Sequence, residues 1–214
     1  MKGDILIIDE NHRKAASQVV DLILDDIKNK PNKFVITVAG ESGAGKSEVA
    51  ESISDKLQSL GIKCFVFGQD DYFVYPPKTN AKTREKDIAW VGMQEVKLDL
   101  LDQNLKDATE KEAPINKPLV DFNADKIGEE TVDLSGYDVL IAEGTYTTTL
   151  TNVDKKIFID RNKMDTVESR KKRAREAQDE FLDKILTIEH EIIAPHKEIA
   201  DVVIAKTWTA KVNY

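Results

Sequence analysis

The sequence predicts an α/β fold, in which helices cover a mostly parallel sheet. Short apolar runs rich in β-branched residues alternate with longer stretches whose apolar residues recur at helical spacing. A glycine-rich segment separates one such run from the helical stretch after it. The chain has 214 residues, 41% of them hydrophobic, which suits one domain with a sizeable core. We therefore expect a single domain over residues 1–214.

Six runs are short enough to be strands rather than buried helices, and we expect five of them to form the central sheet. They cover residues 5–9, 34–39, 63–68, 138–143, 156–160 and 201–205. The first run and the helical pattern of residues 12–28 make an N-terminal addition over about residues 1–30, which shows no catalytic motif. We expect this addition to cover an edge of the sheet.

The stretches between the strands predict two more helices and a binding loop. Residues 49–60 and 94–105 carry apolar residues at helical spacing. Residues 75–89 contain two prolines among many charges, which is typical of a functional surface loop. Residues 106–137 are polar, with a weak strand signal at 119–122, and predict a small hairpin or a loop.

Composition limits the classes of partner. Thirty-nine acidic and thirty-one basic side chains give a formal charge of −8, the wrong sign for a protein that neutralises nucleic-acid or membrane phosphates. The single cysteine excludes an internal disulfide, and the sequence shows neither a secretory leader nor a long apolar run. We expect a cytoplasmic protein with a small-molecule partner, and a homo-oligomer stays open.

The glycine-rich segment is a complete phosphate-loop motif placed between a predicted strand and a predicted helix. Its glycines allow backbone N–H groups to converge on phosphate oxygens at the positive end of the new helix. The lysine would reach the β- and γ-phosphates, and the serine would ligate Mg²⁺. This predicts binding of ATP with Mg²⁺ by Gly40, Glu41, Ser42, Gly43, Ala44, Gly45, Lys46 and Ser47.

Carboxylates follow two other predicted strands at the edge where open α/β sheets bind ligands. Asp70 and Asp71 come after the run at 63–68, and a carboxylate there can accept the proton of an acceptor hydroxyl. Glu143 ends the run at 138–143 and suits the metal that Ser47 would ligate, with Asp70 beside it. The alternative is that these acids cap the turns or helices that follow.

A basic helix is predicted after the strand at 156–160. Arg170 and Arg173 lie three residues apart on one face, and Arg175 lies off that face. Arginines near a phosphate loop can clamp the transferred group, so residues 161–180 are interpreted as a lid with Arg175 as a further nucleotide contact. A charged stripe on a helix can equally be a solvated face.

Together these segments resemble the uridine kinase and phosphoribulokinase family. The resemblance spans about residues 34–205, and it rests on the phosphate loop, Gln69-Asp70-Asp71-Tyr72-Phe73, Leu140-Ile141-Ala142-Glu143-Gly144, the basic helix, and Pro195 with Ala200-Asp201-Val202-Val203-Ile204. It implies a three-layer α/β/α P-loop fold of the nucleoside-monophosphate-kinase type, with ATP as phosphoryl donor. By the same resemblance, Asp70 matches the catalytic base, Glu143 the magnesium-associated glutamate, and Arg170 and Arg173 the lid arginines.

The acceptor is not identified by this resemblance. Uridine kinases have Pro-x-Tyr-Asp-Phe followed by a base-contacting histidine, whereas this chain has Pro118-Leu119-Val120-Asp121-Phe122 and then Asp125. The family's Asp-His-Pro segment is also absent, since residues 87–92 read Asp-Ile-Ala-Trp-Val-Gly. We expect the acceptor to be a polar or anionic hydroxyl compound, a nucleoside or a sugar, contacted from residues 72–90 by Tyr72, Tyr75, Arg84 and Asp87.

Two other functions fit parts of the sequence. Residues 162–165 match the guanine-reading pattern Asn-Lys-x-Asp, and residues 133–136 match Asp-x-x-Gly. A GTPase switch needs the second pattern after its magnesium strand, however, and here it comes before it. A regulatory ATP-binding module would need the phosphate loop but not Asp70.

His190-Glu191 begins like a zinc-protease motif without completing it, and we interpret His190 and His196 as ordinary surface residues.

Overall fold

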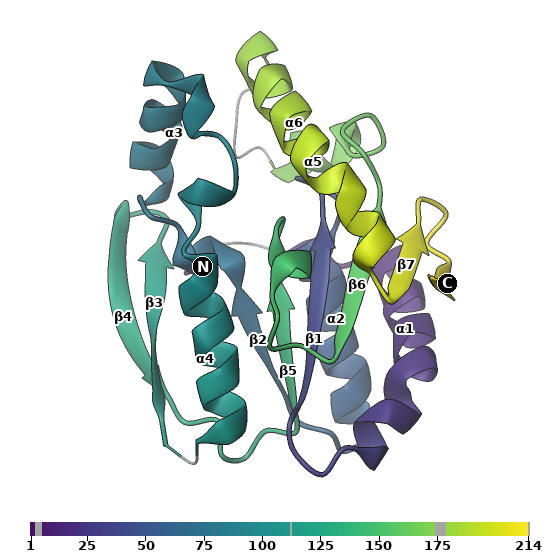
Figure 1. Cartoon of the computed structure of the whole chain (residues 1–214). Helices are drawn as coiled ribbons and strands as arrows, with labels where there is room; N and C mark the ends of the chain where they lie inside the picture. Colours follow the sequence, from purple (N-terminus) through teal and green to yellow (C-terminus); the bar gives the residue numbers. More distant parts are fainter. Residues whose placement is uncertain (3–5, 112, 174–178, 214) are drawn as a thin grey trace.

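The computed structural model describes residues 1–2, 6–111, 113–173 and 179–213, without the side chain of Arg173. A six-stranded sheet runs through its centre in the order β2-β5-β1-β6-β7-β8, as Figure 1 shows for its labelled strands. The first five strands in this order are parallel, and β8 pairs antiparallel with β7. The strands are β1 Phe34–Gly40, β2 Cys64–Gly68, β5 Val139–Glu143, β6 Lys155–Asp160, β7 Val202–Ala205 and β8 Ala210–Val212.

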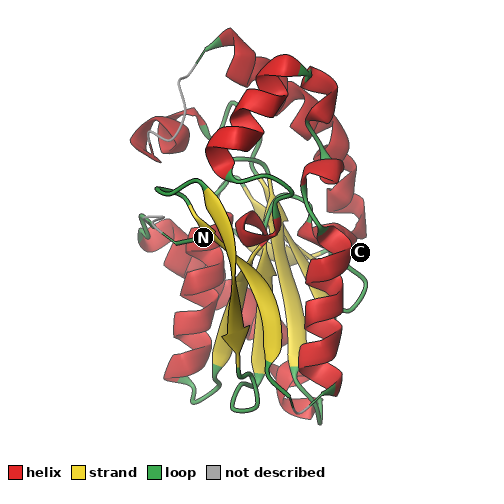
Figure 2. Cartoon of the chain, turned by 90° about the vertical axis from the view of Figure 1, so that its left-hand side faces the viewer, coloured by secondary structure: helices red, strands yellow, loops and turns green. Residues whose placement is uncertain are grey.

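Helices cover both faces of this sheet, which makes the three-layer α/β/α arrangement seen edge-on in Figure 2. One face carries α1 Glu10–Asn29 and α2 Lys46–Ser59, and the other carries α4 Leu98–Glu110 and the end of α6 Glu180–Ile193. An antiparallel hairpin of β3 Ile115–Asp121 and β4 Lys126–Val132 packs beside α4. Above the carboxyl ends of the strands lie α3 Pro77–Lys86 and the start of α6, with α5 Val167–Arg173 nearby (Figure 1).

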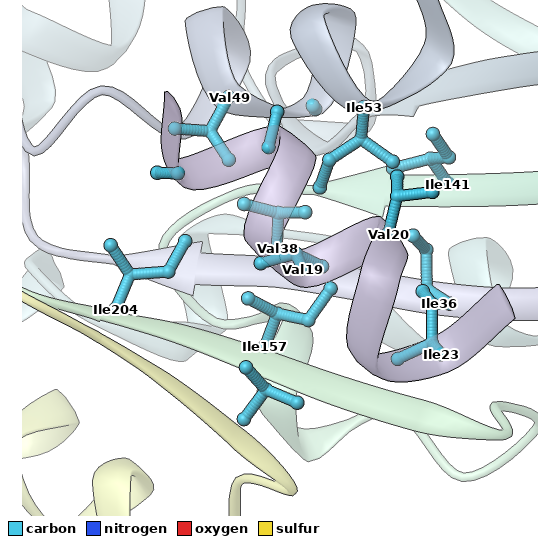
Figure 3. Close-up of a cluster of buried hydrophobic side chains, with 14 of the residues drawn as sticks. Val19, Val20, Ile23, Ile36, Val38, Val49, Ile53, Ile141, Ile157 and Ile204 are labelled. Atoms are coloured by element: carbon cyan, nitrogen blue, oxygen red, sulfur yellow. The ribbon is translucent and has the colours of Figure 1, made fainter. Parts of the chain in front are cut away.

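The central strands β1 and β5 are buried at nearly every position and almost entirely apolar, because both of their faces are covered. In β1, Ile36 and Val38 face the α1/α2 layer, whereas Val35 faces the α4 layer. In β5, Ile141 belongs to the first cluster and Leu140 to the second. Figure 3 shows the first cluster, where side chains of α1 and α2 meet those of the sheet. Successive side chains of a strand point to opposite faces of the sheet, so one continuous apolar segment contributes to both hydrophobic clusters.

The N-terminal addition differs from its prediction. Residues 6–9 form no strand, and Asp9 instead caps α1 by accepting backbone N–H bonds. Lys2 makes an isolated parallel bridge to Asp121 of the hairpin. The helix itself is confirmed, but it packs on α2 and β8 and buries a face of the sheet rather than only its edge. The sixth strand of the sheet comes from the C-terminal end, where the sequence predicts none.

The predicted binding loop at residues 75–89 is largely helical. Pro77 occupies the first turn of α3, where the missing N–H group costs no hydrogen bond, so the prolines start this helix instead of preventing one. The predicted helix at residues 94–105 begins later, at Leu98, because a short 3₁₀ helix over Met93–Glu95 precedes it. The hairpin at residues 115–132 confirms the weak strand signal. Within the described ranges, no helix is long and apolar enough to cross a membrane.

We expect Ile23→Ala to lower the free energy of unfolding by about 2–5 kcal/mol, because Ile23 is 1% exposed and the change leaves a cavity between α1 and the sheet. Its neighbour Leu22 is 42% exposed, so Leu22→Ala should change stability by no more than about 0.5 kcal/mol. Urea unfolding of the two variants checks this contrast. Equal losses would show that α1 does not pack as described.

Candidate functional site

The phosphate loop connects β1 to α2 in the manner that its motif requires. The strand ends at Gly40, and α2 starts at Lys46 with Gly45 as its N-cap residue. No side chain caps this helix, so its first N–H groups remain directed at the loop. The Lys46 ammonium donates to the carbonyl oxygen of Glu41 at 3.0 Å, across the loop. This is a site for an anion at a helix N-terminus.

Two positions of the loop require glycine, because the backbone has a positive φ there and neighbouring side chains leave no room for a Cβ atom. Gly43 has φ +75°, and a Cβ there would lie 2.7 Å from Cγ of Arg170. Gly45 has φ +97°, and a Cβ there would lie 2.9 Å from Nε2 of His12 and 3.0 Å from the Trp208 ring. Side chains from α1 and from the loop after β7 therefore pack directly behind the phosphate loop.

These supporting side chains are themselves fixed by contacts. The His12 and Trp208 rings meet edge to face with centroids 4.8 Å apart, and the Arg161 guanidinium lies 4.6 Å from the Trp208 ring centre. Nδ1 of His12 accepts the backbone N–H of Asp9 and also lies 3.1 Å from the Asp9 carboxylate. Burial lowers the pKa of His12, which favours the neutral imidazole.

The predicted metal ligands meet at the carboxyl end of β5. The Ser47 hydroxyl donates to Oε2 of Glu143 at 3.1 Å. Glu143 is 9% exposed, and its carboxylate packs against Gly68 of β2, where a Cβ would lie 3.3 Å from Oε1. Burial raises the pKa of Glu143, and the nearby negative charge of Asp70 raises it further.

These residues fit Mg²⁺ in a site completed by a nucleotide. A buried carboxylate whose ionised form is disfavoured is stabilised by a cation, and Mg²⁺ prefers oxygen ligands. The described residues contain no group of three or more His, Cys, Asp or Glu side chains able to hold a metal alone. Ser47 and Glu143 would therefore hold the ion together with phosphate oxygens and water, as is usual for Mg²⁺ in phosphoryl-transfer sites.

The adjacent carboxylates after β2 have different environments. Asp70 lines the cleft beside the phosphate loop. Asp71 is buried and accepts the backbone N–H of Val120 at 3.0 Å, and its other oxygen lies 3.2 Å from the Lys117 ammonium. Asp71 thus fixes the hairpin to the sheet. The two interpretations of this pair were a carboxylate that accepts a proton and a structural carboxylate. The position of Asp70 suits the first, and the contacts of Asp71 fit the second.

A cleft of about 260 Å³ contains most of the candidate chemistry. It joins the phosphate-loop residues Ser42, Lys46 and Ser47 to Asp70 and Glu143. The remaining lining residues come from the start of the chain, the segment after β2, α3, the hairpin, the loop after β5, and α6. They are Met1, Phe73, Pro77, Lys78, Asn80, Ala81, Arg84, Phe122, Thr145 and Glu189.

Arg84 is the predicted acceptor residue that the structure brings into this cleft. Its Nε lies 2.5 Å and its Nη2 3.0 Å from the two oxygens of Glu95, which is fully buried. Glu95 also accepts from Asn80 and from the backbone N–H of Gly92. The same Nη2 lies 3.4 Å from Glu189 of α6. Arg84 therefore connects α3 to α6 through a buried charge cluster.

Three other predicted acceptor contacts lie outside the cleft lining. Tyr72 is 0% exposed, and its hydroxyl donates to Oδ1 of Asn104 within the core. Tyr75 packs against Trp90 on the surface, and Asp87 caps a 3₁₀ helix by accepting the N–H of Ala89. The structure therefore does not bring these three side chains to the cleft lining, because Tyr72 points into the core from the 3₁₀ helix Gln69–Tyr72, and Tyr75 and Asp87 flank α3 outside its two ends.

The hairpin fixes the start of α3. The α3 helix has no cap from its own chain segment, and Asp125 of the hairpin turn accepts the backbone N–H of Lys78 at 2.7 Å and the hydroxyl of Thr79 at 2.9 Å. Asp125 follows β3, at the position where uridine kinases have a histidine. In this chain it caps the start of α3. No local pattern in the sequence indicates this contact, because the partners lie almost fifty residues apart.

The described residues do not confirm the predicted lid. Arg170 lies on α5 over Gly43 and donates to the Lys163 carbonyl oxygen and the Thr166 hydroxyl. Arg173 ends α5, and Arg175 lies outside the described residues. Of the predicted arginines, Arg170 is therefore the one whose side chain is placed beside the phosphate loop.

Helix α6 also contacts the phosphate loop, which the sequence did not indicate. Nδ1 of His190 lies 2.5 Å from Oε1 of Glu41, whose side chain is buried. The prediction of ordinary surface histidines is wrong for His190, because it pairs with this loop, and for His196, which is 9% exposed. Adjacent residues of α6, Glu189 and His190, thus contact Arg84 of α3 and Glu41 of the phosphate loop.

We expect Tyr72→Phe to lower the free energy of unfolding by about 1–3 kcal/mol, because Asn104 would lose its buried partner. Turnover per folded molecule should stay within about twofold of wild type, since Tyr72 does not line the cleft. Thermal unfolding and steady-state rates test both parts. A large loss of turnover without loss of stability would return Tyr72 to the acceptor site.

We expect Glu143→Gln to abolish Mg²⁺-dependent turnover while stabilising the metal-free protein at pH 8 by on the order of 1–3 kcal/mol. Folding raises the pKa of Glu143, so the ionised form of this side chain destabilises the folded state. This destabilisation grows as the pH rises from the ordinary pKa of a glutamate through the raised pKa of Glu143. The difference between variant and wild type should vanish near pH 4. Denaturant unfolding at both pH values measures it, and a less stable variant at pH 8 would contradict the described environment.

Comparisons with known proteins agree with this geometry. A sequence model described as the Phosphoribulokinase / Uridine kinase family matches residues 35–213. A uridine kinase of Macrococcus caseolyticus is 27% identical over 185 residues, which cover 79% of this chain and 86% of that protein. A bifunctional alpha-galactosidase/sucrose kinase of Mediterraneibacter gnavus is 26% identical over 192 residues, 83% of this chain but 20% of that protein, so the chain spans about a fifth of this relative.

A solved structure shows the same fold. The structure of a possible uridine kinase from Bacillus stearothermophilus superposes with a TM-score of 0.64 at 21% sequence identity, over 89% of this chain and 97% of that one. The family match covers the phosphate loop, the strand ends with Asp70 and Glu143, and α5, and it leaves out α1. The chain belongs to the phosphoribulokinase / uridine kinase family.

Proposed function

We propose that this protein transfers the γ-phosphoryl group of MgATP to a hydroxyl group of a small metabolite. The family assignment makes it a kinase that acts on a small metabolite. The observation that carries the finer proposal is that Lys46, Ser47, Glu143 and Asp70 line one cleft. A phosphate-binding side and a carboxylate able to accept a proton thus face the same space.

In the proposed reaction, each described side chain has a physical role. Backbone N–H groups of the phosphate loop and Lys46 would hold the β- and γ-phosphates, and Ser47 with Glu143 would hold the metal. Mg²⁺, when bound, would neutralise charge on the phosphate oxygens. Asp70 orients the acceptor hydroxyl and accepts its proton as the oxygen bonds to the γ-phosphorus. The bond between that phosphorus and the β,γ-bridging oxygen breaks, and ADP leaves.

The arginines of α5 are proposed as the part that closes over the transferred group. Cγ of Arg170 lies against Gly43 of the phosphate loop, and its guanidinium would leave Lys163 and Thr166 to reach the γ-phosphate. Arg173 and Arg175 would add further positive charge. Arginines that stabilise such transition states contribute roughly 10³- to 10⁵-fold in rate in related chemistry.

The relatives support a hydroxyl acceptor but give different ones. One relative acts on uridine and another on sucrose, as their names state. Both acceptors offer hydroxyl groups, and both relatives are more than 25% identical to this chain. We therefore assign a nucleoside or sugar type of acceptor at this step, without choosing between them.

The GTPase alternative gains no support from the structure. The oxygens of Asn162 and Asp165 accept backbone N–H groups within their own turn, and Lys163 pairs with Asp183 and Thr187 of α6. The Asp-x-x-Gly segment at residues 133–136 precedes β5, at the end of the sheet opposite the phosphate loop. A glycine there has no access to a γ-phosphate.

We expect Asp70→Asn to lower acceptor-dependent ADP release by about 10²- to 10⁴-fold while MgATP binding stays within a few fold, since the amide cannot accept the proton. The matched control is Asp71→Asn, which should lower stability by removing the partner of Lys117 but leave turnover per folded molecule within about tenfold. Coupled ADP assays and calorimetric MgATP titration measure both. Equal turnover in Asp70→Asn and wild type would leave a nucleotide-binding module as the function.

A further inference from the structure

We propose that His190 is a positioning residue for nucleotide binding, which acts by holding the carboxylate of Glu41 in the phosphate loop. This inference rests on the proposed kinase function, because it concerns how MgATP is held. The observation that carries it is the contact of 2.5 Å between Nδ1 of His190 and Oε1 of Glu41, which joins α6 to the second residue of the loop. The two residues lie 149 positions apart, so the pair forms only in the folded chain.

The backbone of Glu41 organises the phosphate loop. Its carbonyl oxygen accepts the N–H of Ala44 at 3.1 Å and the Lys46 ammonium at 3.0 Å. The first bond closes the turn of the loop, and the second orients the lysine that would reach the β- and γ-phosphates. A displacement of Glu41 would therefore disturb both the turn and Lys46.

The side chain of Glu41 brings a negative charge to the loop that would surround a triphosphate. This side chain is 7% exposed, and a carboxylate close to phosphate groups repels them. Its Oε2 is buried and has no hydrogen-bond partner among the described residues. Within the same ranges, the hydrogen-bonding partner of this carboxylate is therefore His190, which contacts Oε1. With Glu41 ionised, Nδ1 carries the proton between them, because a carboxylate only accepts.

His190 is held in place by its helix and is not needed to pack it. Ile193 of α6 is fully buried in the core, and the Lys163 ammonium lies 2.7 Å from Asp183 and 2.9 Å from Thr187 on the same helix. The His190 side chain itself is 45% exposed, so it contributes little apolar burial. The contact with Glu41 is thus the interaction that its replacement would remove.

The test is a double-mutant cycle on MgATP binding, measured by calorimetry with His190→Ala, Glu41→Gln and the combined variant. We expect His190→Ala to raise the Kd for MgATP about tenfold, because it leaves a buried carboxylate in the loop without its partner. In the Glu41→Gln background the same change should alter the Kd by less than about twofold, since the amide carries no charge. Equal effects of His190→Ala in the two backgrounds overturn the inference.

Two further variants on α6 separate positioning from a purely structural role. His190→Asn keeps an N–H donor close to the place of Nδ1 and should recover most of the affinity that His190→Ala loses. The control Glu191→Ala changes the next, exposed residue of the helix and should leave the Kd within about twofold of wild type. Thermal unfolding confirms that each variant is folded during the titration. A wild-type Kd in His190→Ala, or a loss that His190→Asn does not recover, overturns the inference.

Turnover distinguishes a failure of this inference from a failure of the proposed function. If both hold, His190→Ala should raise KM for MgATP while kcat at saturating MgATP stays within about threefold. A loss confined to kcat, or wild-type turnover without coupling in the binding cycle, overturns the inference and leaves the kinase standing. If no acceptor stimulates ADP release by the wild-type protein while the binding cycle shows the expected coupling, the kinase fails and the role of His190 in nucleotide binding stands.

Discussion

The site depends first on the parallel pairing of β1, β5 and β2. Their register sets Glu143 opposite Val38 on one side and opposite Gly68 on the other, so three strands end at one edge. From that edge the phosphate loop leaves β1, Asp70 follows β2, and the Glu143 carboxylate reaches Ser47 across the β1–β5 boundary. A slip of one residue in β5 would turn Glu143 to the other face and separate it from Ser47.

The same edge explains how much of the site follows from sequence alone. A phosphate loop and acids that end apolar strands are local patterns, and in a parallel sheet strand ends converge, so Lys46, Ser47, Asp70 and Glu143 could be placed together in advance. The cluster around Arg84 could not be predicted, because Glu95, Glu189 and Asn80 meet only through contacts between α3, a 3₁₀ helix and α6. No periodic pattern marks such contacts.

The errors in the fold have the same origin. Prolines and charges at residues 75–89 favour a loop by local propensity, but Asp125 caps the segment from the hairpin and Arg84 binds Glu95, so tertiary contacts make it a helix. Residues 6–8 look like a strand because they are apolar, yet the next residue, Asp9, caps α1 and so marks the start of a helix. The sixth strand is three residues long, too short for a periodic signal.

The N-terminal helix α1 supports the phosphate loop as well as covering a face of the sheet. It lies outside the family match at residues 35–213, yet His12 from it packs against the position where Gly45 would carry a side chain. Trp208, from the far end of the chain, meets the same ring, so both ends of the sequence support the loop that binds phosphate. A loop held from behind in this way keeps its N–H groups directed at the nucleotide without spending nucleotide-binding energy on ordering it. The N-terminal helix therefore helps to position the phosphate loop, although His12 does not itself line the cleft.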